Sequence, residues 1–364
     1  MDSDVLLVIV VATALAFDFT NGFHDTANVV ATAISTRAVP PRVAVLFASI
    51  LNFVGAFVSL KVAATVASGI VDPDQITMTI VFAGLVGAIA WNLATWYFGL
   101  PSSSSHALIG GLVGSTVAAA GTGAVDGNGL LSKVIVPALI APVLAFVVAG
   151  VAILVIYAIV GRMRPGPVTR GFRLGQLGSG GLLALSHGTN DAQKTMGIIT
   201  LALVANGNIS ADNFHVPDWV VISSASAIAL GTYIGGWRII RTMGSRIIKM
   251  DSAQGFSSQS AGAVVILASS HFGYPLSTTH VINGGIMGAG AAKRLSAVRW
   301  GVAGNIVAAW ILTLPAAAVG GALVYGLTRI FGTGATGPVV VLAAIVLGAT
   351  ALFGRRYREA MTPA

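Results

Sequence analysis

The sequence predicts an all-α polytopic membrane protein made of two inverted-topology repeats. Each repeat is expected to have a broken helix that carries an Asp motif and a re-entrant helical hairpin. Of the 364 residues, 55% are hydrophobic and 9% are charged, against about 25% charged residues in soluble domains. Apolar runs such as 134–160 exceed the roughly 20 residues that cross a bilayer as a helix. Two polar motifs also occur twice, far apart in the chain.

Apolar stretches between polar loops define the expected elements. We expect membrane spans at residues 4–35, 43–69, 131–160, 174–206, 219–237, 300–329 and 338–354. Two pairs of shorter legs, 76–99 with 103–120 and 258–273 with 277–292, are joined at "GLPSSSSH" and "YPLSTTH". Each pair leaves the sidedness of the chain unchanged, whether it crosses the membrane or dips in and returns.

Charges in the loops predict the orientation and the surroundings of the chain. Basic residues follow the first span, 131–160 and 338–354, whereas Asp72 and Asp74 follow the second span. The positive-inside rule therefore places the N-terminus outside and the C-terminus in the cytoplasm. Three basic residues fit this assignment less well: Lys61, Lys133 and Arg329.

The net charge of +8 would suggest a nucleic-acid partner in a soluble protein. Here the basic residues lie in short loops, so the expected partner is the lipid bilayer and no nucleic acid is expected. The chain has no cysteine, which excludes disulfides, thiolate metal sites and cysteine catalysis. The acidic start "MDSD" is unlike a secretory signal, so we expect the first apolar run to remain as a membrane helix.

The second half of the chain resembles the first in inverted orientation. "GFHDTAN" resembles "GTNDAQK", so that Asp25 matches Asp191, 166 positions later, and "PSSSSHALIGGLVG" resembles "PLSTTHVINGGIMG", 174 positions later. The chain crosses the membrane three times between the two copies. Because this number is odd, the second copy has the opposite orientation in the membrane. Inverted repeats with interrupted helices near the midplane are typical of secondary transporters.

The repeats divide the chain into four parts. The first repeat is expected at 1–161, a basic cytoplasmic loop at 162–173, the second repeat at 174–330 with its hairpin at 258–292, and an extra C-terminal helix with a basic tail at 331–364.

The two hairpin tips carry the features of an anion site. Pro101 ends the preceding helix, and serines cap the next helix, whose N-terminus has free N–H groups and a partial positive charge. Two such ends that face each other bind an anion without an arginine; the alternative is simple capping. The hydroxyls are those of Ser103, Ser104, Ser105, Ser277, Thr278 and Thr279. His106 and His280 follow them, with a structural role favoured over a proton relay.

Asp25 and Asp191 lie in apolar stretches where an unpaired charge is costly, so they are candidates for function; a buried polar contact between helices is the alternative. The amides of Asn28 and Asn190 add neutral oxygens, and carboxylate with amide oxygens suits Na⁺ or a proton. Gly22 and Gly188 predict that both helices unwind there. We expect both Asp motifs and both hairpin tips to lie together near the midplane.

Four motifs in order, "NGFHDTANVVATAISTRA", "WNLATWYFGLPSSSSH", "LSHGTNDAQKTMG" and "YPLSTTH", resemble the inorganic phosphate transporter (PiT) family, above all its bacterial low-affinity members. The resemblance runs from about residue 4 to 330. It implies import of inorganic phosphate by symport across a cell inner membrane, two re-entrant hairpins and a homodimer. It also implies that the Asp motifs and hairpin tips form the substrate and ion site, with no cofactor and no enzymatic activity.

Two departures from the family pattern bear on the coupling ion. Sodium-coupled members resemble G-A-N-D-x-x-N in both copies, whereas this chain has His24 in place of the first Asn and Lys194 in place of the last. Proton-coupled bacterial members are more similar at both places, and they imply phosphate carried as a neutral metal–phosphate complex. We expect Lys194, beside Asp191, to stand in for a coupling cation, with a proton taken up by Asp25 or His24.

Two alternatives remain open at this stage. A Na⁺-coupled phosphate or sulfate symporter of the same family keeps the class and changes the ion. An intramembrane aspartyl protease would also place two Asp residues in separate spans, but the flanking residues, FHD and TND, do not resemble those of such enzymes. No dedicated metal site of the protein itself is predicted.

Overall fold

A computed structural model describes residues 2–210, 213–332 and 334–361. The chain forms helices throughout these residues, with short 3₁₀ and π segments between them, and its only β pairing there is an isolated antiparallel bridge between Val71 and Val125. The α-helices are α1 (Asp2–Ser35), α2 (Pro41–Gly55), α3 (Lys61–Ser68), α4 (Met78–Phe98), α5 (Ser104–Ala120), α6 (Gly127–Leu130), α7 (Val136–Val160), α8 (Pro165–Ala205), α9 (Asp218–Ile234), α10 (Trp237–Arg241), α11 (Ser252–His271), α12 (Thr278–Lys293), α13 (Trp300–Ile330) and α14 (Thr336–Met361).

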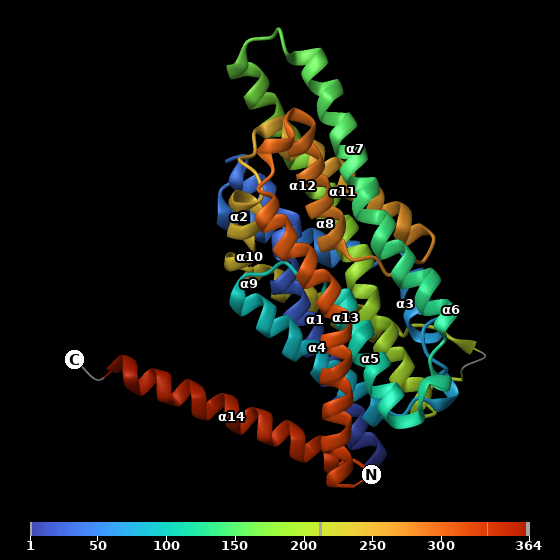
Figure 1. The fold of residues 1–364 in the computed structure, drawn as a ribbon. Helices are drawn as coiled ribbons and strands as arrows, with labels where there is room; N and C mark the ends of the chain where they lie inside the picture. Colours follow the sequence, from blue (N-terminus) through green and yellow to red (C-terminus); the bar gives the residue numbers. More distant parts are fainter. Residues whose placement is uncertain (1, 211–212, 333, 362–364) are drawn as a thin grey trace.

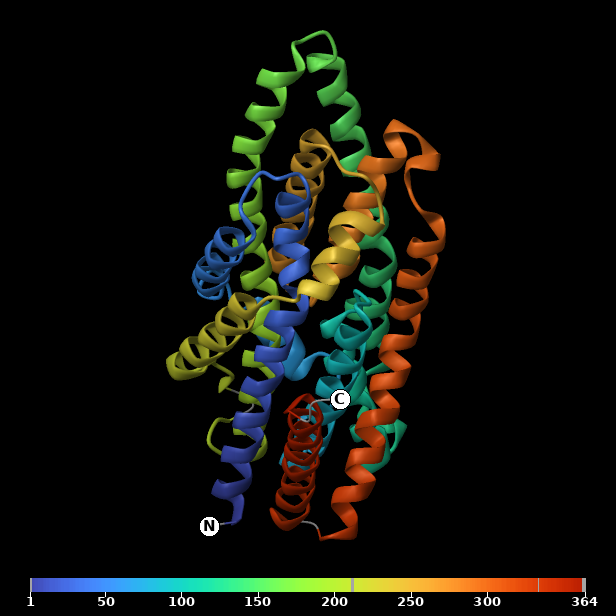
Figure 2. The same cartoon turned by 90° about the vertical axis from the view of Figure 1, so that its left-hand side faces the viewer.

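The long helices run along a common direction as a bundle. In Figures 1 and 2 the end of α7 and the start of α8 project at one end, and the beginning of α1 and the end of α13 lie at the other. Within the residues that the structure describes, four helical segments are long and apolar enough to cross a membrane, and a fifth is bent by 59° between α9 and the segment at 237–246. The all-α polytopic prediction is therefore confirmed.

α8 is long enough to cross as well, since its 41 residues rise about 60 Å at 1.5 Å per residue. Its middle is polar, yet residues 183–203 are almost entirely buried among other helices. α14 begins near the C-terminal end of α13 and runs away from the side of the bundle (Figures 1 and 2). The predicted extra C-terminal helix therefore forms. Its crossing of the membrane remains a prediction.

The prediction that the two Asp helices are broken is wrong, because α1 and α8 each continue through their motif. The glycines there allow close packing of helices instead of unwinding. A Cβ on Gly22 would lie 2.9 Å from the backbone nitrogen of Thr232 in α9, and one on Gly188 would lie 2.7 Å from Cα of Asn52 in α2. Each Asp helix thus packs backbone to backbone against a helix of the other half.

The interruptions lie in other helices. The span predicted at 43–69 is divided into α2 and α3, and the one predicted at 219–237 ends in a bend between α9 and α10. The predicted loop at 162–173 is also wrong beyond its first residues, because α8 begins at Pro165. Proline in the first turn favours a helix start, since its φ angle is preset and its missing N–H is not needed there.

Each hairpin packs on one long helix through a pair of glycines. In α5, Gly110 and Gly114 face the backbone of α13, and in α12, Gly284 and Gly288 face the backbone of α7. A Cβ would lie 2.5 Å from Cα of Ala318 if added at Gly114 and 2.7 Å from Cα of Phe146 if added at Gly288. Small residues four positions apart let helices approach closely in a membrane, where burial of apolar surface gives little drive for association.

We expect Gly114→Val and Gly288→Val to destabilise the folded protein by about 1–3 kcal/mol each, because the added carbons would force the paired backbones apart. Thermal unfolding of the purified protein in detergent measures this. Gly304→Val is the control, since that glycine lies in α13 with open space around it. Equal melting temperatures for all three variants would contradict the close-packing explanation.

Candidate functional site

The two hairpin tips have the same local structure. Gly99, with a left-handed φ of 66°, ends α4, and Ser103 caps α5 by accepting a hydrogen bond from the backbone N–H of His106 at 3.1 Å. In the second hairpin Gly273, at φ 78°, follows α11, and the Ser277 hydroxyl caps α12 from the equivalent position. Each tip therefore presents a helix N-terminus with adjacent hydroxyl groups toward the interior.

The predicted convergence of the tips with both Asp motifs is confirmed. Ser104 Oγ lies 3.3 Å and Thr279 Oγ1 lies 3.4 Å from Asp25 Oδ1. Thr278 Oγ1 lies 3.3 Å from Asp191 Oδ2. Asn28 donates from Nδ2 to the hydroxyl oxygens of Thr278 at 3.2 Å and Thr279 at 2.9 Å. Hydroxyls of both hairpins therefore surround the two carboxylates.

Lys194 lies at the centre of this polar cluster. Its ammonium donates to Asp191 Oδ1 at 2.5 Å, to Ser105 Oγ at 2.6 Å and to the carbonyl oxygen of Leu276 at 2.8 Å. Lysine has three N–H donors, so the buried ammonium is fully satisfied. Because these partners belong to α8, the first hairpin and the second hairpin, one side chain joins all three.

Two histidines flank the carboxylates. His24 Nδ1 lies 2.8 Å from Asp25 Oδ1, and its Nε2 lies 3.1 Å from Thr95 Oγ1. His187 was missed by the sequence analysis, although it stands four residues before Asp191, which is the same face of a helix. Its Nε2 lies 3.2 Å from Asp191 Oδ2. Ligand atoms of His187, Asp25 and Asp191 all lie within 4.8 Å of one another, a donor set that suits a divalent cation.

Some predicted residues lie at the margin of the cluster. Asn190 points to the first leg of the second hairpin, where it donates to Ser270 Oγ at 2.9 Å and to the carbonyl of Tyr274 at 3.2 Å. His106 and His280 pack against each other behind the tips, with ring centroids 4.7 Å apart, and His280 stacks on Trp310 at 4.1 Å. The structural role that the sequence favoured for both histidines remains a prediction.

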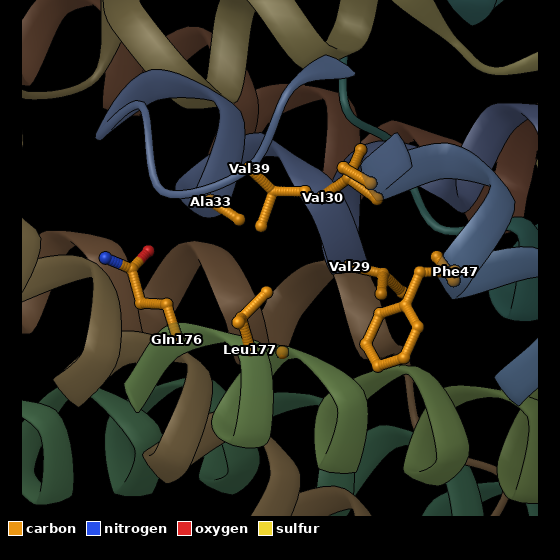
Figure 3. A pocket seen from close by; sticks show the side chains of 10 residues that line it. Val29, Val30, Ala33, Val39, Phe47, Gln176 and Leu177 are labelled. Atoms are coloured by element: carbon orange, nitrogen blue, oxygen red, sulfur yellow. The ribbon is translucent and has the colours of Figure 1, made fainter. Parts of the chain in front are cut away.

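The cluster is closed to solvent in this conformation. Asp25, Asn28, Asp191 and Lys194 are each at most 2% exposed. Beyond Asn28, on the C-terminal side of α1, lies an apolar crevice between α1, α2 and α8 (Figure 3). Val29, Val30 and Leu177 line it, and Gln176 is the polar side chain shown at its edge. A hydrated ion would find few partners there, so the polar cluster ends sharply at this side.

The chemistry of the cluster combines anion and cation recognition. α5 and α12 both begin here, and the first N–H groups of a helix have no partners within it. Together with six hydroxyls they form an environment suited to an oxyanion. The carboxylates and Lys194 set the charge, because removing ions from water costs several kcal/mol each unless they are paired. A buried site of this kind, with groups for both anions and cations between two opposed hairpins, is typical of a secondary transporter.

Comparison with known proteins identifies the family. A model described as "Phosphate transporter family" matches residues 21–321, and the chain belongs to this family. The family and the names of its relatives indicate a transporter, so the expectation that the protein is not an enzyme is confirmed and the aspartyl-protease alternative is wrong.

Several relatives cover nearly the whole chain. It is 52% identical to a probable low-affinity inorganic phosphate transporter of Mycobacterium tuberculosis over 97% of this chain and 84% of that one. It is 50% identical to a protein of the same description from Rhizobium meliloti, over 88% and 96% of the two chains. Among solved structures, one described as the sodium-dependent phosphate transporter is similar with a TM-score of 0.80 at 25% identity, over 89% of this chain and 99% of that one.

We expect Lys194→Met to lower the stability of the protein by about 3–5 kcal/mol, because it leaves the Asp191 carboxylate buried without its ammonium partner. The double variant with Asp191→Asn should recover most of the loss. Thermal unfolding in detergent measures both. Lys293→Met is the matched control, since its 3.5 Å pair with Asp251 is exposed and contributes about 0–1 kcal/mol. A single variant as stable as the wild type would show that Lys194 does not hold the cluster together.

Proposed function

We propose that the protein imports inorganic phosphate across the cell inner membrane by proton symport. The observation that carries the proposal is the buried cluster in which two hairpin tips meet two carboxylates and one ammonium. Membership of the phosphate transporter family supports the same substrate. The N-terminus lies outside and the C-terminus in the cytoplasm in this proposal, and two copies form a homodimer.

Phosphate is held mainly by hydroxyls and helix N-termini. The proposed ligands are Ser103, Ser104 and Ser105 of the first tip and Ser277, Thr278 and Thr279 of the second. Asp25 and Asp191 complete the site by accepting hydrogen bonds from the P–OH groups that phosphate keeps near neutral pH. Sulfate has no such proton and would be repelled by both carboxylates, which favours phosphate over sulfate as the substrate.

Coupling to protons follows from the charge of the cluster. Lys194 supplies a tethered positive charge 2.5 Å from Asp191, where sodium-coupled relatives are expected to have an asparagine. This charge reduces the electrostatic need for sodium. The transported proton is then held by Asp25 or by His24, whose Nδ1 is 2.8 Å from that carboxylate. Asn28 and Asn190 orient the surrounding hydroxyls and backbone.

Two variations of this function have support of their own. The structural relative is described as sodium-dependent, which favours Na⁺ as the co-transported ion in an otherwise identical cycle. The close approach of His187 to Asp25 and Asp191 favours a divalent cation that enters with phosphate as a neutral complex. In both cases the cation is cargo, and no resident cofactor is required.

We expect Ser104→Ala and Thr278→Ala each to weaken phosphate uptake by about 1.5–3 kcal/mol, the range for a hydrogen bond to a charged group, which is roughly a tenfold to hundredfold rise in the apparent Kd. Uptake of radioactive phosphate into proteoliposomes measures this. Ser115→Ala is the control, because that hydroxyl lies on α5 but donates to Ile80 and Leu112 carbonyls far from the tip. Unchanged kinetics in both tip variants would remove the hydroxyls from the phosphate site.

Replacing Lys194 by asparagine tests the coupling ion directly. Proteoliposomes with the wild type should accumulate phosphate in response to a pH gradient and ignore a sodium gradient. Lys194→Asn should lose activity or gain a requirement for sodium, because the fixed positive charge is gone. Sodium-dependent uptake by the wild type, or wild-type behaviour of Lys194→Asn, would exclude Lys194 as a substitute for the coupling cation.

A further inference from the structure

A polar stripe on α1 extends beyond the cluster that the proposed function uses. Asp18, Asn21, Asp25 and Asn28 recur at intervals of three or four residues, which places them on one face of the helix. All four are at most 2% exposed. Asp25 and Asn28 contact the second hairpin tip, whereas Asp18 and Asn21 lie toward the N-terminal end of α1. Nothing in the phosphate site requires them.

Asp18 is fully buried, at 0% exposure, and neither of its carboxyl oxygens has a hydrogen-bond partner among the described residues. Thr195 of α8 and Asn21 lie beside it. The Thr195 hydroxyl and the Asn21 amide oxygen also have no partner in that part of the chain. Four buried oxygens without a hydrogen-bond partner among the described residues therefore belong to side chains at the contact between α1 and α8.

Charged groups of α8 lie near Asp18. Asp191 and Lys194 of α8 are the ionised groups that act on Asp18, and Asp25 with His24 lies about two turns further along α1. α4 carries no charged residue, and α9 has only Asp218 at its first position. The positive charge of Lys194 is already bonded to Asp191. A second carboxylate here would thus be buried without a cation of its own.

Burial of an unpaired carboxylate costs several kcal/mol, and a group in that position usually becomes neutral instead. A protonated Asp18 removes the charge and supplies an O–H that can donate to Thr195 or Asn21. We propose that Asp18, with Asn21 and Thr195, forms a proton-binding site on the N-terminal side of the phosphate cluster. It takes up one proton when that side opens and releases it on the other side with the phosphate.

This inference rests on the proposed function and moves the coupled proton from Asp25 or His24 to a residue outside the duplicated motifs. Ala184 stands 166 positions after Asp18 and is the residue that matches it in the second copy. The site therefore occurs only in the first half, and it carries one proton. Asp25 remains a ligand of the hairpin hydroxyls and of phosphate, in contact with His24.

The test compares wild type, Asp18→Asn and Asp74→Asn, the last an exposed carboxylate, in proteoliposomes. Each preparation is measured for accumulation driven by a pH gradient of about one unit and for phosphate counterflow without a gradient. In Asp18→Asn one proton fewer is coupled to each phosphate. At a pH gradient of about one unit, the ratio of accumulation to counterflow should therefore fall about tenfold. Asp74→Asn should keep the wild-type ratio.

Infrared spectroscopy of the purified protein gives a second readout that does not depend on transport. The carbonyl band of a protonated, unhydrated carboxyl should be present in the wild type, absent in Asp18→Asn and shifted in Thr195→Val, which keeps the acid and removes one acceptor. A wild-type ratio in Asp18→Asn would overturn the proposal, and so would the same infrared band in that variant. A response of accumulation to a sodium gradient that Asp18→Asn abolishes would also overturn it, and would make the four oxygens a sodium site.

Failure of the proposed function gives a different result. Wild-type proteoliposomes would then show no phosphate counterflow, or no response to the pH gradient, whatever residue stands at position 18. The infrared band still decides whether Asp18 holds a proton in that case.

Discussion

The buried ammonium of Lys194 is the interaction on which the centre of the molecule depends. It bonds to a carboxylate of its own helix, to a hydroxyl of the first hairpin and to a backbone carbonyl of the second. Without it, Asp191 and the two hairpin tips would meet in the interior with no side chain bonded to all three. An ion in a dry interior is tolerated only when its neighbours satisfy every donor, so the geometry of all three elements is constrained together.

Close packing of helix backbones allows the hairpin tips and the Asp helices to come together around Lys194. Both hairpins approach a long helix through glycine pairs, and both Asp helices approach a helix of the other half through Gly22 and Gly188. In a bilayer the apolar surface gives little drive for helices to associate, and van der Waals contact between closely packed backbones takes its place. The polar cluster can therefore lie deep inside the bundle, away from both water and lipid.

Much of this site could be predicted from the sequence, because it is encoded in local chemistry. Serines after Pro101 predict a capped tip, and Asp191 with Lys194 three residues later predicts a pair on one helical face. The continuity of α1 and α8 could not be predicted in this way. Gly22 and Gly188 have the local propensity of helix breakers, and only the approach of α9 and α2 reveals their role in packing. Asp18 lacks a repeated motif, so burial alone distinguishes it.

The pairing of each Asp helix with a helix from the opposite half has a consequence for synthesis. α1 packs on α9 and α8 packs on α2, and the side chains of Ser49 and Asn52 bond to α9 at 2.7 and 2.8 Å. α1 therefore leaves the ribosome with Gly22 uncovered, and more than 180 further residues follow its end at Ser35 before α9 begins at Asp218. Insertion into the membrane and final assembly are thus separate events for this chain. The early helices need either a temporary neighbour or a loosely packed intermediate in the bilayer until the later ones arrive.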